Sequence, residues 1–229
     1  MRQSKKKFKA EIRRETALNY LEYLPKGFDP KSAKKYPLLI FLHGMGERGD
    51  DLSLLKRHGI PKLIDEQAPF TREYEFIAIS PQCPDGLWWP WVCEELAMLL
   101  RQYLGAMPVD TGRIYMTGLS MGGYGTWEFA RRYPNALAAI APICGGTSAN
   151  ALIGGIGHLP VWAFHGEKDP VVSLSETAGA VARLNDLGAK VKYTVYPGVE
   201  HDSWTATYEN PELYRWLFSQ RNGAFELGT

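Results

Sequence analysis

The stretch Arg113-Ile-Tyr-Met-Thr-Gly-Leu-Ser-Met-Gly-Gly123 decides the fold. An apolar segment typical of a buried strand runs here into a helix-like segment, and Ser120 lies at the turn between them. Glycines two residues before and after the serine remove side chains that would collide in so sharp a turn. The stretch therefore predicts a Ser120 hydroxyl exposed above the carboxyl end of a sheet, where open α/β sheets bind ligands. The alternative is an ordinary glycine-rich turn in which Ser120 caps a helix.

Outward from this turn, apolar runs of strand length alternate with helix-like periodicity. The runs predict strands at 8–14, 17–24, 37–43, 75–80, 113–118, 138–144, 160–165 and 191–197. The periodicity predicts helices at 51–67, 91–106, 120–133, 173–187 and 209–219. This order is typical of an α/β fold, with a mostly parallel eight-stranded sheet and helices on both faces. The first two runs lie close together and predict an antiparallel N-terminal edge.

A glycine-rich loop, Phe41-Leu-His-Gly-Met-Gly-Glu-Arg-Gly49, follows the strand expected at 37–43. Acyl transfer needs donors for the oxyanion of its tetrahedral intermediate, and a flexible backbone can approach the bound carbonyl closely. We expect the N–H groups of Met45 and Met121 to be these donors. His43 is expected to shape the loop by hydrogen bonding and not to act in catalysis. The alternative is a plain glycine turn.

A base and an acid for Ser120 are expected in loops that follow later strands. Among the five histidines, His201 follows the last expected strand and fits best as the general base. Asp169 lies in the loop after the preceding strand and is favoured over Glu167 as the acid that orients the imidazole. The chain order is therefore Ser120, Asp169, His201.

These motifs resemble those of the α/β-hydrolase superfamily, which has the same order of nucleophile, acid and base. Within it, the chain is similar to the phospholipase/carboxylesterase and dienelactone-hydrolase-like branch of small esterases without a lid. The resemblance spans nearly the whole chain and implies Ser120, Asp169 and His201 as a triad, with Met45 and Met121 as oxyanion donors. Dienelactone hydrolases proper use a cysteine nucleophile, so Ser120 disfavours lactone opening.

Aromatic residues gather in the segment Pro81-Gln-Cys-Pro-Asp-Gly-Leu-Trp-Trp-Pro-Trp91, next to the expected site. We expect substrate to be contacted by Gln82, Trp88, Trp89 and Trp204. The alternative is that the tryptophan rings cap the core. Only short segments, notably 146–159, separate the strands near the site, so no large lid is expected.

Composition narrows the class of protein. A chain of 229 residues that is 45% hydrophobic suits a single domain over 1–229, and a formal net charge of +1 predicts no attraction to nucleic acid or to a membrane surface. No secretion signal is recognised, so a cytoplasmic location is expected. The three cysteines predict free buried thiols and no disulfide framework. No cofactor or metal signature is found, and the oligomeric state is left open.

Together these features predict a serine carboxylesterase for short-chain or aryl soluble esters. Two alternatives remain open from the sequence. One is a thioesterase or peptidase with the same triad, and the other is a non-catalytic binding protein of the same fold.

Overall fold

A mostly parallel sheet of seven strands forms the centre of the protein. The computed structural model describes residues 3–11, 15–147, 150–189 and 191–228. Within them the strands are β1 (Tyr20–Tyr23), β2 (Tyr36–Leu42), β3 (Ile77–Pro81), β4 (Val109–Leu119), β5 (Ala139–Ile143), β6 (Trp162–Gly166) and β7 (Lys192–Tyr196). Their order across the sheet is β1-β3-β2-β4-β5-β6-β7, and only β1 runs antiparallel to its neighbour. The predicted α/β class is therefore confirmed.

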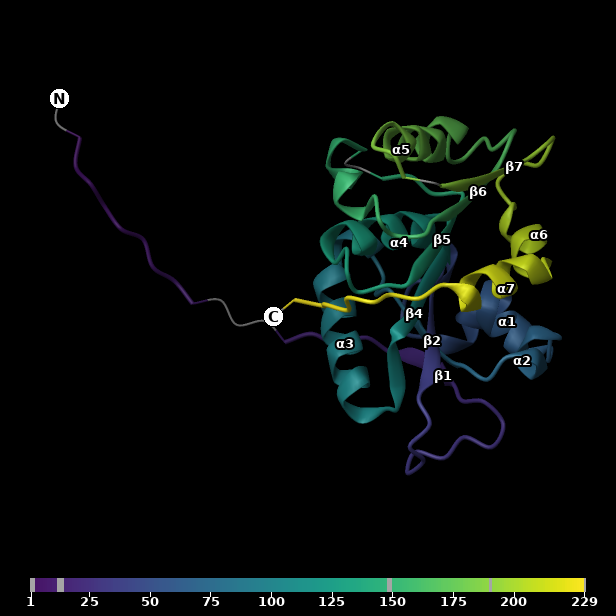
Figure 1. The fold of residues 1–229 in the computed structure, drawn as a ribbon. Helices are drawn as coiled ribbons and strands as arrows, with labels where there is room; N and C mark the ends of the chain where they lie inside the picture. The colour runs from purple at the N-terminus through teal and green to yellow at the C-terminus, as the bar shows by residue number, and fades with distance from the viewer. Residues whose placement is uncertain (1–2, 12–14, 148–149, 190, 229) are drawn as a thin grey trace.

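Helices cover both faces of the sheet (Figure 1). One face carries α3 (Cys93–Ala106), α4 (Met121–Arg132) and α5 (Leu174–Asp186). The other face carries α1 (Gly59–Asp65), α2 (Phe70–Glu73), α6 (Trp204–Glu209) and α7 (Pro211–Ser219). In the described part of the chain, the connections contain the 3₁₀ helices η1 (Met45–Glu47), η2 (Leu52–Arg57), η3 (Trp89–Trp91) and η4 (Asn150–Ile156). None of the helices in the described ranges is long and apolar enough to cross a membrane.

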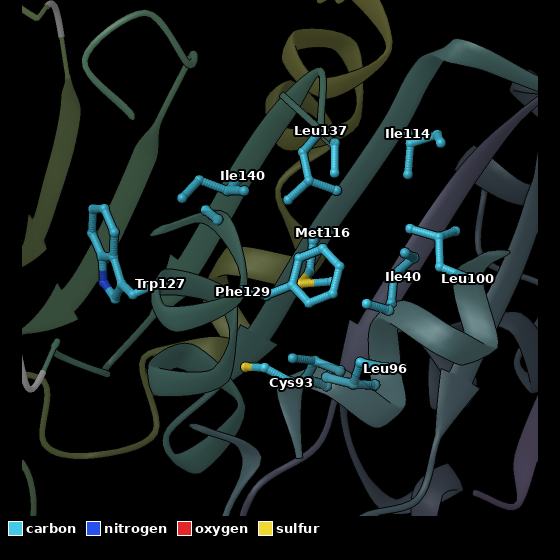
Figure 2. Packing of buried hydrophobic residues seen from close by; sticks show 14 of the residues in the cluster. Ile40, Cys93, Leu96, Leu100, Ile114, Met116, Trp127, Phe129, Leu137 and Ile140 are labelled. Atoms are coloured by element: carbon cyan, nitrogen blue, oxygen red, sulfur yellow. The ribbon is translucent and has the colours of Figure 1, made fainter. Parts of the chain in front are cut away.

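Strand β2 is apolar along its whole length because both of its faces are buried. Leu38 and Ile40 pack into the core under α3 and α4, whereas Leu39 and Phe41 pack into the second core under α1 and α6. Both faces of the strand are therefore buried, as expected for a central parallel strand. Figure 2 shows part of the first core, in which Leu96 of α3 belongs to the same cluster as Ile40.

The N-terminal edge differs from the prediction of eight strands. Residues 8–11 are exposed and form neither helix nor strand, and residues 12–14 lie outside the described ranges. Strand β1 does not pair with this segment but lies antiparallel to β3, with Tyr20 opposite Pro81. Residues 3–11 carry four lysines around a single large apolar side chain, so the segment has no apolar face to bury. Figure 1 shows it extending away from the sheet.

The helix predicted at 51–67 is interrupted at Gly59. His58 is extended, and Gly59 has a φ of +64°, which L side chains rarely adopt. A Cβ at this glycine would lie 2.4 Å from the Phe41 ring. The segment therefore divides into η2 and α1 and brings the backbone close to strand β2.

Candidate active site

Ser120 occupies a strained turn between β4 and α4. Its φ is 53° and its ψ −114°, a conformation that few non-glycine residues adopt. A Cβ at Gly118 would lie 2.4 Å from the Gly122 carbonyl oxygen, and one at Gly122 would lie 1.9 Å from the Leu42 carbonyl oxygen. Ser120 occupies the N-cap position of α4, but its side chain makes no capping hydrogen bond, so its hydroxyl is not used to cap the helix.

A chain of hydrogen bonds joins Ser120, His201 and Asp169. The His201 Nδ1 lies 2.7 Å from the Asp169 Oδ2, and its Nε2 lies 2.9 Å from the Ser120 Oγ. A carboxylate only accepts hydrogen bonds, so Nδ1 carries the proton and Nε2 is free to accept from the serine hydroxyl. The Asp169 side chain is fully buried, whereas the His201 side chain keeps 19% of its surface exposed. The structure thus brings together the three side chains that the sequence singled out.

Two backbone N–H groups hold the Asp169 carboxylate in place. Its Oδ1 accepts hydrogen bonds from the N–H groups of Val171 and Val172, at 2.8 and 2.9 Å. Burial alone would raise the pKa of this carboxyl, but the hydrogen bonds from His201 and from the two N–H groups hold it below its ordinary value. The neighbouring Glu167 accepts from the Gly198 N–H instead.

The loops after β6 and β7 are tied together, which sets the position of His201. The Lys168 N–H donates to the Val199 carbonyl at 2.9 Å. A Cβ at Gly166 would lie 2.0 Å from the Glu200 carbonyl oxygen, so only glycine permits this approach. Asp202 points away and accepts from the Thr205 N–H.

The loop after β2 borders the same hollow as Ser120. Met45 and Met121 are the first residues of η1 and α4, so their N–H groups have no acceptor within those helices. Met45 and Ser120 line the same hollow. These positions are compatible with the predicted role of the two N–H groups as oxyanion donors.

His43 shapes this loop, as the sequence predicted. Its Nδ1 donates to the Gly44 carbonyl at 2.6 Å, and its Nε2 accepts from the Cys83 N–H at 2.9 Å. Burial lowers the pKa of His43 to about 4, so the ring is neutral near pH 7. The indole N–H of Trp89 donates to the His43 carbonyl at 3.0 Å and fixes the start of the loop.

Ser120 opens into a surface hollow of about 380 Å³. Its walls include Met45, Trp88, Tyr124 and Val172. The rings of Trp88 and Tyr124 lie 5.4 Å apart between centroids, which gives the hollow an aromatic side. A small acyl or aryl group would find an apolar surface there.

The structure corrects three of the four predicted substrate contacts, and two of these three are buried in the interior. Gln82 is 1% exposed and donates to the carbonyls of Glu47 and Asp51, at 2.8 and 2.9 Å. Trp89 is fully buried. Both lie behind the hollow and support the loop after β2, because the chain turns inward directly after Trp88.

The other two predicted contacts have different surroundings. Trp88 lines the hollow. Trp204 does not line it but meets the His201 ring edge to face at 5.2 Å between centroids and contacts His58 on another side. Its position supports the base and not the hollow.

Sequence reasoning missed Tyr124 and Val172 as lining residues. Tyr124 lies one helical turn after Ser120, so helical spacing from the nucleophile could have identified it. Val172 follows Asp169 within the same loop and could not be identified from the sequence, because valine is a common core residue.

The residues that could hold a metal coincide with this site. Within the described ranges, the ligand atoms of Cys144, Asp169 and His201 lie within 4.8 Å of one another. Burial raises the pKa of the Cys144 thiol to about 12, and Asp169 already binds the His201 Nδ1. A neutral thiol is a poor metal ligand, so this donor set does not suit a metal centre. All three cysteines are free and buried, as predicted.

Comparison with known proteins places this site in a family. The chain is 36% identical to a thermostable esterase of known structure, covering 89% of this chain and 59% of the other, with a TM-score of 0.81. A ferulic acid esterase is 19% identical over 86% of this chain and 89% of the other, with a TM-score of 0.67, and shares the fold.

A curated relative is the bifunctional acetylxylan esterase/xylanase of Neocallimastix patriciarum. It is 26% identical over 208 residues, which cover 85% of this chain but 27% of the relative. The chain thus spans about a quarter of that relative and less than two thirds of the thermostable esterase.

The family model of the dienelactone hydrolases matches residues 74–214. That range is more than half of the chain and contains Ser120, Asp169 and His201. The chain therefore belongs to the dienelactone hydrolase family.

Proposed function

We propose that this protein is a carboxylic ester hydrolase in which Ser120 is the nucleophile. The observation that carries the proposal is the continuous hydrogen-bond chain from Asp169 through His201 to the Ser120 Oγ, at the floor of an open hollow. The esterases among the similar proteins support the same class of reaction. The non-catalytic alternative gives no reason for the hydrogen bonds that connect the buried Asp169 through His201 to Ser120.

In the proposed reaction, the Ser120 Oγ attacks the ester carbonyl carbon while the His201 Nε2 takes the hydroxyl proton. The carbonyl oxygen becomes an oxyanion and accepts hydrogen bonds from the N–H groups of Met45 and Met121. The C–O bond to the alcohol breaks as His201 returns the proton to the leaving oxygen. An acyl-enzyme remains on Ser120.

Water then completes the cycle by the same route. His201 takes a proton from the water as its oxygen attacks the acyl carbon, and then returns the proton to Ser120 as the acid leaves. Asp169 stays ionised and stabilises the imidazolium that forms twice in each cycle. Its low pKa suits this role, since the carboxylate persists well below neutral pH.

The first test removes the nucleophile. Ser120→Ala should lower kcat for p-nitrophenyl acetate by roughly 10⁵-fold, because triad members act as a unit. It should also abolish covalent labelling by a fluorophosphonate probe. The control is Ser175→Ala, which replaces an exposed serine of α5 and should leave both measurements unchanged. Full hydrolysis by Ser120→Ala would refute the proposed nucleophile.

The hollow suggests small or aryl acyl groups as substrates. Each methylene that enters an apolar site adds about 0.8 kcal/mol, or roughly fourfold, to binding. We therefore expect kcat/KM to rise from p-nitrophenyl acetate to butyrate and to gain nothing at octanoate, where the chain would extend into solvent. Methyl ferulate should be accepted because Trp88 and Tyr124 offer ring faces. A steady increase up to octanoate would refute this preference.

A further inference from the structure

His165 is a fully buried histidine that the proposed reaction does not use. It lies in β6, and its side chain is 0% exposed. Its Nε2 lies 3.2 Å from the Asp169 Oδ2, the same oxygen that binds the catalytic base His201. One carboxylate oxygen of Asp169 is therefore approached by two imidazole rings, of which the His201 ring is partly exposed and the His165 ring is buried.

The contacts of the His165 Nδ1 require a proton on that atom. The Nδ1 lies 2.7 Å from the Thr177 Oγ1. The Thr177 hydroxyl has one proton, which it donates to the Gly145 carbonyl at 2.6 Å. The hydroxyl oxygen can then only accept from Nδ1, so Nδ1 must carry a hydrogen.

The contacts of the His165 Nε2 require a second proton. This nitrogen lies 2.9 Å from the Val172 carbonyl oxygen and 3.2 Å from the Asp169 carboxylate. Both partners only accept hydrogen bonds. A ring that donates from both nitrogens is an imidazolium, whereas either neutral tautomer would leave two acceptors facing each other.

We propose that His165 is a positioning residue that donates from both ring nitrogens as an imidazolium, holds Asp169 by an ion pair and opposes the effect of the Asp169 charge on His201. The inference rests on the proposed function, because it assigns His201 as the base. The Asp169 charge by itself would favour the protonated form of His201. A second cation beside the same carboxylate oxygen opposes that effect and so makes His201 take up a proton less readily.

Other titratable groups around this pair do not supply the cation. Cys144 is a neutral thiol, and burial raises the pKa of Tyr124 to about 12. Glu176, next to Thr177 on α5, and Asp202, next to His201, are acids. His165 is the only described histidine besides His201 that contacts Asp169.

Spectroscopy tests the protonation state without using catalysis. In ¹⁵N-labelled Ser120→Ala protein, NMR should detect protons on both ring nitrogens of His165 at pH 8. A single ring proton on His165 would overturn the inference. Because this variant has no nucleophile, the result does not depend on whether the protein is an esterase.

The pH profile tests the effect on His201. His165→Gln places an uncharged amide donor near the former Nε2, so it keeps the contact with Asp169 and removes the charge. The acid limb of kcat/KM should then move up by about one pH unit, because unit charges so close interact at that scale. An unmoved limb would overturn the electrostatic effect.

A second pair of variants covers the case in which His165→Gln does not fold. Thr177→Val removes the acceptor of the Nδ1 proton and should shift the acid limb in the same direction. Thr177→Ser keeps the hydroxyl and should retain the wild-type profile. Equal profiles for the valine and serine variants would overturn the inference. If Ser120→Ala still hydrolysed esters while NMR showed two ring protons, the proposed function would fail and the charge on His165 would stand.

Discussion

On one side of the hollow Ser120 is positioned by close backbone packing, whereas on the other side Asp169 and His201 are positioned by side-chain hydrogen bonds. Around the serine, Cβ atoms at Gly118 or Gly122 would lie 1.9 to 2.4 Å from carbonyl oxygens. Around the aspartate, two backbone N–H groups and two histidines approach one carboxylate. The position of Ser120 therefore depends on steric fit, whereas the positions of Asp169 and His201 depend on charge and hydrogen bonding.

This difference separates two kinds of sensitivity. A change on the serine side should affect folding, because backbone atoms have nowhere to move. A change of charge on the aspartate side should affect the reaction first, because the shape of the carboxylate can be copied by an amide. Each prediction below compares the two.

The largest effect is expected on the aspartate side. In Asp169→Asn an amide would replace the carboxylate, and its NH₂ would face the His201 Nδ1–H, so the imidazole would adopt the wrong tautomer. We expect kcat to fall by about 10⁴-fold. Thermal unfolding should change much less, because the amide oxygen can still accept from Val171 and Val172. Glu167→Gln, in the same turn, should retain kcat to within a fewfold, and a drop as large as that of Asp169→Asn would contradict the assignment of the acid.

The next effect is expected on the serine side. Gly122→Ala would place a Cβ 1.9 Å from the Leu42 carbonyl oxygen, and neither backbone segment can move freely. We expect the free energy of unfolding to fall by about 3 kcal/mol or more, measured by urea denaturation. Gly105→Ala on α3 is the control, since nothing lies within 4 Å of its Cβ position. That variant should gain up to about 1 kcal/mol in helix propensity, and equal stability of the two variants would contradict the steric explanation.

The smallest effect is expected from His43, which lies on the serine side but acts through side-chain hydrogen bonds. Its pKa is about 4 in the folded protein and 6.5 ordinarily. Between these values the unfolded chain binds more protons, so stability is fully present above pH 6.5 and is lost as pH falls towards 4. The loss is about 1.4 kcal/mol per pH unit.

The measurement is urea denaturation of wild type and His43→Asn between pH 5 and 7. The asparagine amide can still donate to the Gly44 carbonyl but does not titrate. The variant should therefore show a shallower dependence of stability on pH than the wild type. Identical slopes would mean that His43 is not the group responsible.

The same contrast explains what the sequence could predict. The glycines around Ser120 are a local pattern, so the turn, β4 and α4 were identified at once. Asp169 and His201 were found only through the order of strand ends, since no local pattern marks them. The sequence does not mark His165 either, because its contacts with Thr177 and Asp169 depend on how β6 packs against α5.

Errors in the fold have equally physical causes. Periodicity across 51–67 could not reveal the break at Gly59, which depends on the Phe41 ring. The N-terminal run at 8–14 was read from residue types alone, whereas β1 pairs with β3, which lies more than fifty residues later in the sequence. Trp88 and Trp89 are adjacent in sequence, but Trp88 lines the hollow and Trp89 is buried, because η3 begins at Trp89 and turns that ring inward.

The φ of 53° at Ser120 has a consequence for laboratory evolution. Glycine would adopt that backbone conformation without strain, so Ser120→Gly should relieve energy that the folded protein now stores. A library screened for heat resistance alone would then enrich clones that have lost the nucleophile. Any effort to make this protein more robust must select for turnover in the same round.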